Sequence, residues 1–308
     1  MNDLYKRLIE SVVTNDHKSS KKLVKTILDG DTTQSNRMFV RRMQNMLNTS
    51  TMNLLELPSN LQGMFTMEDV STSFNEKRFV VTNEETNIVK QIIDIYNTNE
   101  KLNEYGIQYL NSLMLYGVSG CGKTMLGRYI AYKVGLPFGY LNFTNLISSY
   151  LGTTGKNISE VFRYVKDHKC VLMLDEIDAI GLSRGTKNDV GELNRVCINL
   201  MQQLDTFDSG NILIGATNRV QDIDKALLRR FSKQFEIKIP DVNVRKSIAE
   251  SYLDTIPNSV YNNSDLNDFA INTENKSCAE ITNILVNGIV QCLVNNRDIN
   301  LENINLTI

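Results

Sequence analysis

The stretch that decides the fold is Gly117-Val-Ser-Gly-Cys-Gly-Lys-Thr124. It follows a short apolar run at residues 113–116 and precedes an amphipathic stretch at residues 125–131. This order of a strand, a glycine-rich loop and a helix is typical of the G-x-x-x-x-G-K-[ST] motif. In that motif, backbone N–H groups at the start of a helix hold nucleotide phosphates. The alternative is a chance glycine-rich turn, which would need neither a strand before it nor a helix after it.

Two side chains of this stretch carry specific expectations. Lys123 is expected to reach the β- and γ-phosphates, and the hydroxyl of Thr124 is expected to bind Mg²⁺. Cys121 lies beside the helix start and Lys123, which favour a thiolate, so we expect it to react with thiol reagents. The other residues expected to line the nucleotide are Val118, Ser119, Gly120, Cys121, Gly122 and Met125.

Four further apolar runs follow along the chain, at residues 138–141, 171–174, 212–216 and 234–239. Amphipathic stretches with helical spacing separate them. Short, nearly continuous apolar strands that alternate with helices are typical of a parallel sheet buried on both faces. Together with residues 113–116, these runs predict a five-stranded parallel sheet in an α/β core.

Two carboxylates come directly after the third of these five runs, at Asp175 and Glu176. Ligands of open α/β sheets bind at the carboxyl ends of the strands. Asp175 is therefore suited to hold Mg²⁺ through water, and Glu176 is suited to polarise an attacking water. Taken alone, the pair would be better interpreted as two solvated acids that begin a loop, but the preceding phosphate loop favours the site.

Polar residues also follow the fourth strand. Asn218 comes two residues after the run at residues 212–216. It could contact the γ-phosphate or the attacking water, although asparagine is also a common turn residue. Arg229 and Arg230 come shortly afterwards. Paired arginines usually belong to a solvated face, but at this place they could reach a nucleotide that a neighbouring subunit holds.

The conjunction of these motifs resembles the AAA ATPases, a family within the AAA+ superfamily. The resemblance covers roughly residues 76–308 and implies a P-loop AAA+ core with a small helical lid domain, ATP and Mg²⁺ as ligands, and a ring, expected to be a hexamer. It also implies ATP hydrolysis that remodels, unfolds or threads a protein substrate. The segments that carry the resemblance are the phosphate loop, Asp175–Ile180, Gly215–Arg219, Ala226–Phe231, Ser277–Ile281 and Ile299–Asn303.

The chain departs from the family pattern in the arginine segment and in the lid. Ala226–Phe231 lacks the usual Pro-Gly spacer and is closest to the compact form of the spastin- and katanin-like branch. The start of the lid helix reads Cys278-Ala-Glu280 in place of Gly-Ala-Asp, with Ala279 expected against adenine. The family's other adenine contact should lie near Phe79–Thr82, where this chain has no glycine.

The triplet Tyr150-Leu151-Gly152 is similar to the family's pore loop. The resemblance implies that these three residues project into the central pore of the ring and grip extended polypeptide. Tyrosine suits this role because it offers a large contact area with few torsions to order. The alternative is a tyrosine packed at the end of a helix.

The 308 residues divide by pattern into four segments. Residues 1–50 have apolar side chains at helical spacing, such as Leu4, Leu8 and Val12, and predict a small helical N-terminal unit. Residues 51–75 are rich in turn formers and predict a linker. The ATPase core is expected at residues 76–240 and the lid at 241–308, with the N-terminal unit recruiting a substrate or adaptor.

Composition limits the alternatives. The balance of 33 Lys and Arg against 35 Asp and Glu disfavours a nucleic-acid motor or loader. Salt-dependent binding to DNA would favour that alternative again. A nucleotide-switched scaffold with low turnover is a third possibility, which the intact Asp175-Glu176 pair disfavours. Five scattered cysteines and two histidines predict neither a disulfide framework nor a zinc site. With no apolar run of 18 residues, we expect no membrane span and a cytoplasmic protein.

Overall fold

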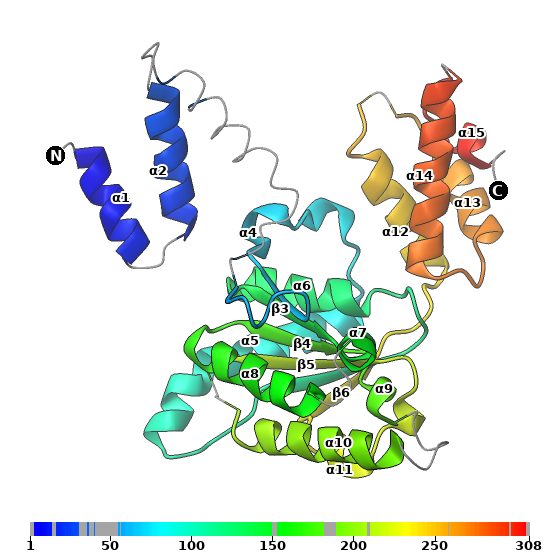
Figure 1. The fold of residues 1–308 in the computed structure, drawn as a ribbon. Coiled ribbons are helices and arrows are strands. Elements are labelled where there is room, and N and C mark those ends of the chain that lie inside the picture. The colour runs from blue at the N-terminus through cyan, green and yellow to red at the C-terminus, as the bar shows by residue number, and fades with distance from the viewer. Residues whose placement is uncertain are drawn as a thin grey trace. The chain divides into compact units, whose positions relative to one another are not determined.

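The computed structural model describes residues 3–13, 17–30, 36, 40, 55, 57–149, 153–181, 189–207, 210–257, 259–295 and 297–305. The chain divides into two compact units (Figure 1). The smaller unit is Met1–Leu54 with Ser71–Ser73, and the larger is Leu55–Val70 with Phe74–Ile308. Each unit is described by itself below.

The smaller unit contains two packed helices, α1 (Asp3–Val13) and α2 (His17–Gly30). A hydrogen bond from the Ser20 hydroxyl to the buried Ser11 hydroxyl, 2.9 Å long, joins them. Both helices lie where the apolar spacing of the sequence predicts helices. Residues 41–50, which complete the predicted helical unit, lie outside the described residues.

The larger unit is built on a six-stranded sheet with the order β1-β3-β4-β5-β2-β6. The five strands β2 to β6 are parallel to one another, which confirms the predicted parallel α/β core. The strands are β1 (Phe65–Glu68), β2 (Ser112–Tyr116), β3 (Phe138–Asn142), β4 (Val171–Asp175), β5 (Ile212–Thr217) and β6 (Lys233–Glu236).

The sixth strand, β1, is a correction to the sequence analysis. It pairs antiparallel with β3, with Phe65 opposite Leu141, although residues 51–75 were expected to be a linker and the sheet to have five strands. Phe65 and Met67 are buried while Thr66 is exposed, so the strand has one face in the core. Four residues of alternation among turn formers are too short a pattern to distinguish from a linker.

Helices cover both faces of the sheet, and the pleat of each strand divides its side chains between two cores. In β2, Leu113 and Leu115 join the core under α5 and α6, while Met114 joins the opposite core under α7 to α11. Figure 1 shows this three-layer arrangement. The helices are α5 (Asn83–Glu104), α6 (Lys123–Val134), α7 (Phe143–Ser149), α8 (Thr154–Asp167), α9 (Asp178–Gly181), α10 (Asp189–Asp205) and α11 (Lys225–Leu228).

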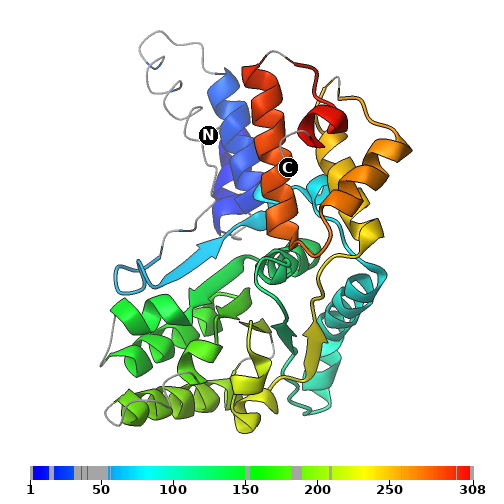
Figure 2. The same ribbon diagram turned by 90° about the vertical axis from the view of Figure 1, so that its right-hand side faces the viewer.

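A helical subdomain with its own apolar core follows the sheet (Figure 2). Buried Arg245 holds its start, because its guanidinium donates to the carbonyls of Pro240 at 2.8 Å and Ala270 at 2.9 Å. Its helices are α12 (Val242–Leu253), α13 (Asn263–Asn272), α14 (Cys278–Val294) and α15 (Leu301–Asn305). The residues that the structure describes also form the short helices α4 (Val70–Ser73), whose last three residues belong to the smaller unit, η2 (Glu76–Arg78) and η3 (Val220–Asp222). Among the described residues, no helix is long and apolar enough to cross a membrane.

The burial of β1 gives a first prediction. Phe65→Ala should lower the free energy of unfolding by about 3–5 kcal/mol, because it removes a fully buried aromatic ring. Urea denaturation followed by circular dichroism measures this loss. Thr66→Ala, on the exposed face of the same strand, is the matched control and should change stability little. Equal effects of the two substitutions would mean that β1 is not part of the core.

Candidate nucleotide-binding site

The glycine-rich loop follows a path that only glycines accept without strain. Gly117 and Gly120 have φ angles of +139° and +78°. A Cβ atom at Gly117 would lie 2.1 Å from the carbonyl oxygen of Ile237, and one at Gly120 would lie 2.9 Å from the Ser277 hydroxyl. The loop is therefore packed between the end of the sheet and the start of α14.

Lys123, the first residue of α6, is buried and hydrogen-bonded at its amine. Its Nζ atom donates to the carbonyls of Gly117 at 2.8 Å and Val118 at 3.0 Å, and to Oδ1 of Asn218 at 2.7 Å. Burial lowers the pKa of Lys123, while nearby ionisable groups such as Asp175 act in the opposite direction. The structure thus brings the loop lysine together with the exposed asparagine that follows β5.

The carboxylate of Asp175 lies at the end of β4, within hydrogen-bond distance of the loop threonine. The hydroxyl of Thr124 donates to Asp175 Oδ2 at 3.2 Å. The hydroxyl of Tyr140, on β3, donates to the same oxygen at 3.0 Å, and Asn142 Nδ2 donates to Tyr140 at 3.4 Å. Burial raises the pKa of Tyr140 to about 12, so it is a neutral donor at physiological pH.

Tyr140 and Asn142 are site residues that the sequence analysis did not identify. The parallel register that pairs Asn142 with Asp175 brings both residues to the same edge as the carboxylate. The available signal was the run at residues 138–141, because polar side chains at a predicted strand end share that edge with those of its neighbour.

The backbone around Glu176 adopts an unusual conformation. Glu176 has a φ of +55°, in the left-handed region that costs energy for a residue with a side chain. Its N–H donates to Asp175 Oδ1 at 2.9 Å. Two residues further on, buried Asp178 accepts a 2.8 Å hydrogen bond from the Thr217 hydroxyl. These contacts fix the acidic turn between β4 and β5.

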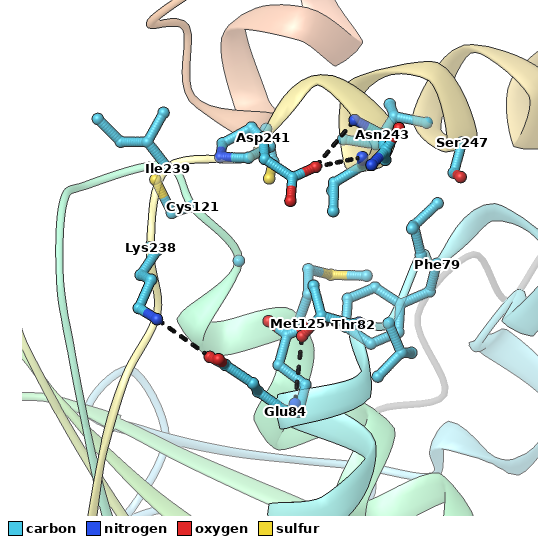
Figure 3. Close-up of a pocket in the computed structure, with 18 of the residues that line it drawn as sticks. Phe79, Thr82, Glu84, Cys121, Met125, Lys238, Ile239, Asp241, Asn243 and Ser247 are labelled. Carbon is cyan, nitrogen blue, oxygen red and sulfur yellow. Dashed lines mark hydrogen bonds and ion pairs between the residues drawn. The ribbon is translucent and has the colours of Figure 1, made fainter.

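A pocket of about 660 Å³ lies beside the loop, between the sheet unit and the helical subdomain (Figure 3). Phe79–Thr82 line it, at the position where the family resemblance implies an adenine contact, without the expected glycine. Several residues of the helical subdomain that the sequence analysis did not name also line it. The lining further includes Glu84, Cys121, Gly122, Met125, Ile239, Asp241, Asn243, Val244, Ser247, Ile248 and Cys278.

The start of α14 contacts the loop through its backbone. The N–H of Ala279 donates to the carbonyl of Gly120 at 2.9 Å. Ser277 and Glu280 form a reciprocal capping box that fixes this helix start. Ala279 therefore lies against the phosphate loop, and its neighbour Cys278 lines the pocket.

The pKa of the Cys121 thiol is shifted in the direction opposite to the one that the sequence favours. The side chain is buried, and burial raises the pKa of its thiol by more than the neighbouring Lys123 lowers it. The helix start and the lysine can be identified from the sequence, whereas the burial of the Cys121 side chain cannot. Burial of Cys121 therefore opposes the thiolate that its neighbours favour.

The remaining predicted site residues differ in what the structure describes. Arg229 is exposed just after α11, and Arg230 is paired with Asp205 of its own chain. Val118 and Ser119 are exposed on the loop. The predicted pore residues Tyr150, Leu151 and Gly152 lie outside the described residues.

Comparison with known proteins identifies this region. Residues 113–239 match the family model described as "ATPase family associated with various cellular activities (AAA)". Over 215 residues, the chain is 34% identical to the ATP-dependent zinc metalloprotease FtsH of Lachnoclostridium phytofermentans, covering 68% of this chain and 37% of that protein.

Two further relatives are similar over longer shares of their length. The uncharacterized AAA family ATPase y4kL of Sinorhizobium fredii is 26% identical over 239 residues, 75% of this chain and 72% of the relative. The proteasome-activating nucleotidase of Methanosphaerula palustris is 30% identical over 251 residues, 77% of this chain and 60% of the relative. The match to FtsH spans little more than a third of that protein. The strand–loop–helix geometry and these similarities lead to one conclusion: residues 113–239 form an ATPase domain of the AAA family.

Proposed function

We propose that this chain assembles into a ring, a hexamer, that hydrolyses ATP with Mg²⁺ in order to remodel, unfold or thread a polypeptide. The observation that carries the proposal is the meeting of Lys123 with Asn218, beside the Thr124–Asp175 hydrogen bond. The names of the relatives support it, since they include an ATP-dependent zinc metalloprotease and a proteasome-activating nucleotidase.

The site fits a nucleoside triphosphate. The buried ammonium of Lys123 is held at the loop by two carbonyls and an amide oxygen, and all three are acceptors that phosphate oxygens can replace. The adjoining pocket of about 660 Å³ is within the range of nucleotide-sized sites and has apolar walls, including Phe79 and Val244. The adenine base would occupy this pocket, with the phosphates along the loop.

The donor set beside the loop also fits Mg²⁺. Hydroxyl and carboxylate oxygens are the ligands that this cation prefers, and Thr124 Oγ1 lies 3.2 Å from Asp175 Oδ2. In this assignment, Thr124 would hold the cation through its hydroxyl, and Asp175 would hold it through water. Bound Mg²⁺ would neutralise charge that develops on the phosphates. Tyr140 would orient the Asp175 carboxylate through its 3.0 Å hydrogen bond.

Glu176 and Asn218 are assigned to the attacking water. A carboxylate next to the metal-binding aspartate can accept a proton from water as it attacks the γ-phosphate. The left-handed backbone at Glu176 supports this role, because strained conformations concentrate at functional sites. Asn218 would sense the γ-phosphate, since it already contacts the lysine assigned to the phosphates.

Two parts of the proposal concern other subunits and the substrate. Arg229 would complete the site of a neighbouring subunit, and Tyr150-Leu151-Gly152 would grip the substrate polypeptide in the pore. The helical unit at residues 1–50 would recruit the substrate or an adaptor. The relatives are named FtsH, proteasome-activating nucleotidase and y4kL, so a place in the spastin- and katanin-like branch rests only on the segment Ala226–Phe231, which lacks the Pro-Gly spacer.

A second prediction separates binding from hydrolysis. Lys123→Ala should weaken ATP binding at least about tenfold, because it removes a charged donor to the phosphates. Glu176→Gln should retain binding and lose roughly 10²–10⁴-fold in kcat, as expected for removal of a general base. Fluorescent-nucleotide titration and phosphate release measure the two effects. Lys166→Ala, an exposed lysine on α8, should match the parent in both assays. Unchanged ATP affinity in Lys123→Ala would refute its assignment.

A third prediction tests whether sites are shared between subunits. Arg229→Ala should bind ATP normally and hydrolyse it roughly 10³–10⁵-fold more slowly, as arginine fingers of other ATPases do. Mixing this variant with Lys123→Ala should restore part of the activity, because the intact pocket of one subunit then meets the intact arginine of the other. Arg163→Ala, an exposed arginine on α8, is the control. Proven co-assembly without recovery would exclude a shared site.

A fourth prediction concerns the pore. Tyr150→Ala should leave the melting temperature, assembly and basal ATP hydrolysis nearly unchanged while stopping the remodelling of a protein substrate. The control is Tyr105→Ala, at an exposed tyrosine at the end of α5, which should change neither the stability and ATP hydrolysis nor the remodelling activity. If Tyr150 were instead a packed core residue, its truncation would cost about 3–5 kcal/mol of stability. A large drop in melting temperature would therefore end the pore assignment.

A further inference from the structure

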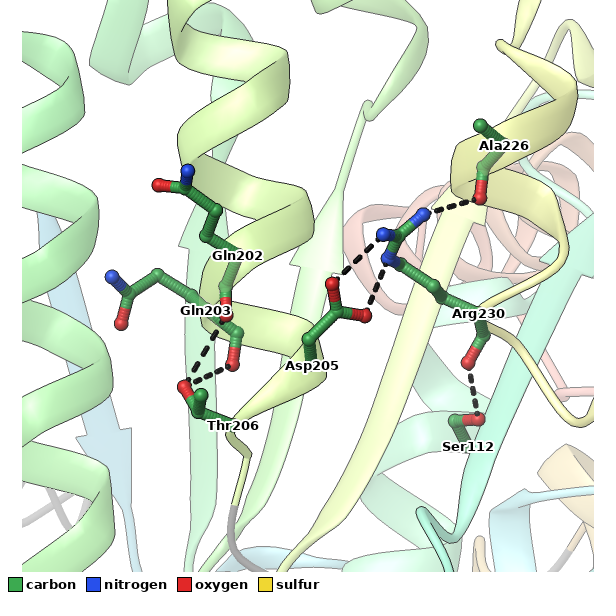
Figure 4. A network of polar contacts seen from close by, with 7 residues as sticks. All are labelled: Ser112, Gln202, Gln203, Asp205, Thr206, Ala226 and Arg230. Carbon is green, nitrogen blue, oxygen red and sulfur yellow. Dashed lines mark hydrogen bonds and ion pairs between the residues drawn. The ribbon is translucent and has the colours of Figure 1, made fainter.

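The paired arginines differ in their surroundings, although nothing in the sequence distinguishes them. The Arg230 guanidinium makes three hydrogen bonds within its own chain (Figure 4). Its Nε and Nη2 atoms donate to the two carboxylate oxygens of Asp205 at 2.7 and 2.8 Å, and Nη1 donates to the Ala226 carbonyl at 2.9 Å. Arg229 is exposed, and its backbone N–H donates to the Lys225 carbonyl at 3.1 Å.

The Arg230–Asp205 contact has the planar, two-bond geometry that is the strongest form of an arginine–carboxylate pair. The Arg230 side chain is partly exposed, at 29%, and the Asp205 side chain is exposed, at 54%. The hydrogen bond lowers the pKa of Asp205 and raises that of Arg230, so both partners stay charged near neutral pH. An exposed one-bond pair contributes little to stability, whereas this pair has a third hydrogen bond that links it to α11.

These bonds join elements that are distant in sequence. Asp205 is the last residue of α10, and Ala226 lies in α11, a helix of four residues that is too short to be stable alone. Leu227 and Phe231, which flank the two arginines in the sequence, are buried in the same apolar core as Leu204 of α10. Arg230 thus connects the end of α10 to the short helix that Arg229 directly follows.

The backbone of Arg230 is fixed as well. Its carbonyl accepts a 3.1 Å hydrogen bond from the Ser112 hydroxyl at the start of β2, and the same hydroxyl accepts from the Ser232 N–H at 2.8 Å. The chain is therefore attached to the sheet immediately after Arg229. With the side chain of Arg230 held by Asp205 and its backbone held by Ser112, Arg229 is the arginine left exposed.

We propose that Arg230 is a positioning residue that acts within its own subunit, where Asp205 holds it so that α11 presents Arg229 alone to the neighbouring nucleotide. This inference rests on the proposed sharing of sites between subunits. It divides the work of two arginines that the sequence analysis treated as equivalent fingers. The competing reading is that Arg230 leaves Asp205 on assembly and enters the neighbouring site as a second finger.

The test is a double-mutant cycle in the full chain, with Asp205→Asn and Arg230→Gln, read as kcat, KM and melting temperature. The two single variants should each lower kcat about tenfold, and the double variant should fall no further, because both remove one interaction. KM for ATP should not change, since neither residue contacts the subunit's own nucleotide in this proposal. Thr206→Ala, whose hydroxyl donates to the Gln202 and Gln203 carbonyls of α10, is the control and should match the parent.

The charge exchange Asp205→Arg/Arg230→Asp gives the sharper result. If the ion pair only positions α11, the exchanged pair should recover kcat to within a few-fold of the parent. If Arg230 is a finger, its loss should cost roughly 10³-fold or more, Asp205→Asn should leave kcat unchanged or higher, and the exchange should not restore activity. Any of those three outcomes would overturn the proposal, and the cycle decides the question even if the exchanged variant fails to fold.

A different result is expected if the proposed sharing of sites between subunits is itself wrong. If sites were not shared between subunits, Arg229→Ala would keep its kcat, whatever the Asp205 and Arg230 variants did. A normal loss in Arg229→Ala together with additive losses in Asp205→Asn and Arg230→Gln would refute the positioning role alone.

Discussion

The site depends on one buried ammonium group, Lys123, that the chain must supply with hydrogen-bond acceptors of its own. Burying a charge without hydrogen-bond partners is costly, and Lys123 meets this constraint with two loop carbonyls and the amide oxygen of Asn218. The carbonyls of Gly117 and Val118 can face the amine only because the loop turns through glycine conformations. The position of the Lys123 amine thus depends on the glycine conformations of the loop.

The parallel sheet places the other groups around this amine. Strands β3, β4 and β5 end at the same edge, so Tyr140, Asp175 and Asn218 come together from positions far apart in the chain. A hydroxyl from β3 and one from α6 meet on a single carboxylate oxygen of β4. The register of the strands, set by the apolar pattern that buries both faces, therefore also sets the spacing of the polar groups.

Much of this arrangement could be predicted from the sequence, because the deciding patterns are local. The phosphate loop, the five parallel strands and the acidic pair each occupy a few consecutive residues with clear neighbours. What the sequence did not contain was contact information. Strand β1 is too short to be recognised from its pattern. The role of Tyr140 could not be predicted without the β3–β4 register, and the direction of the Cys121 pKa shift could not be predicted without knowing that its side chain is buried.

The arginine pair illustrates the same limit. Arg229 and Arg230 are adjacent and chemically identical, and only the position of Asp205 at the end of α10 separates them. That contact spans 25 residues and depends on how the last turn of one helix packs beside another. Local pattern predicts which residues are available, whereas tertiary packing decides which of them are already engaged.

The most direct test of the central claim is a high-resolution structure of Glu176→Gln with ATP and Mg²⁺. The account predicts that Lys123 Nζ exchanges protein acceptors for β- and γ-phosphate oxygens, with the cation beside Thr124 and Asp175. The base should occupy the pocket lined by Phe79–Thr82. A triphosphate bound elsewhere, or one bound here while Lys123 still donates to Gly117, Val118 and Asn218, would contradict it.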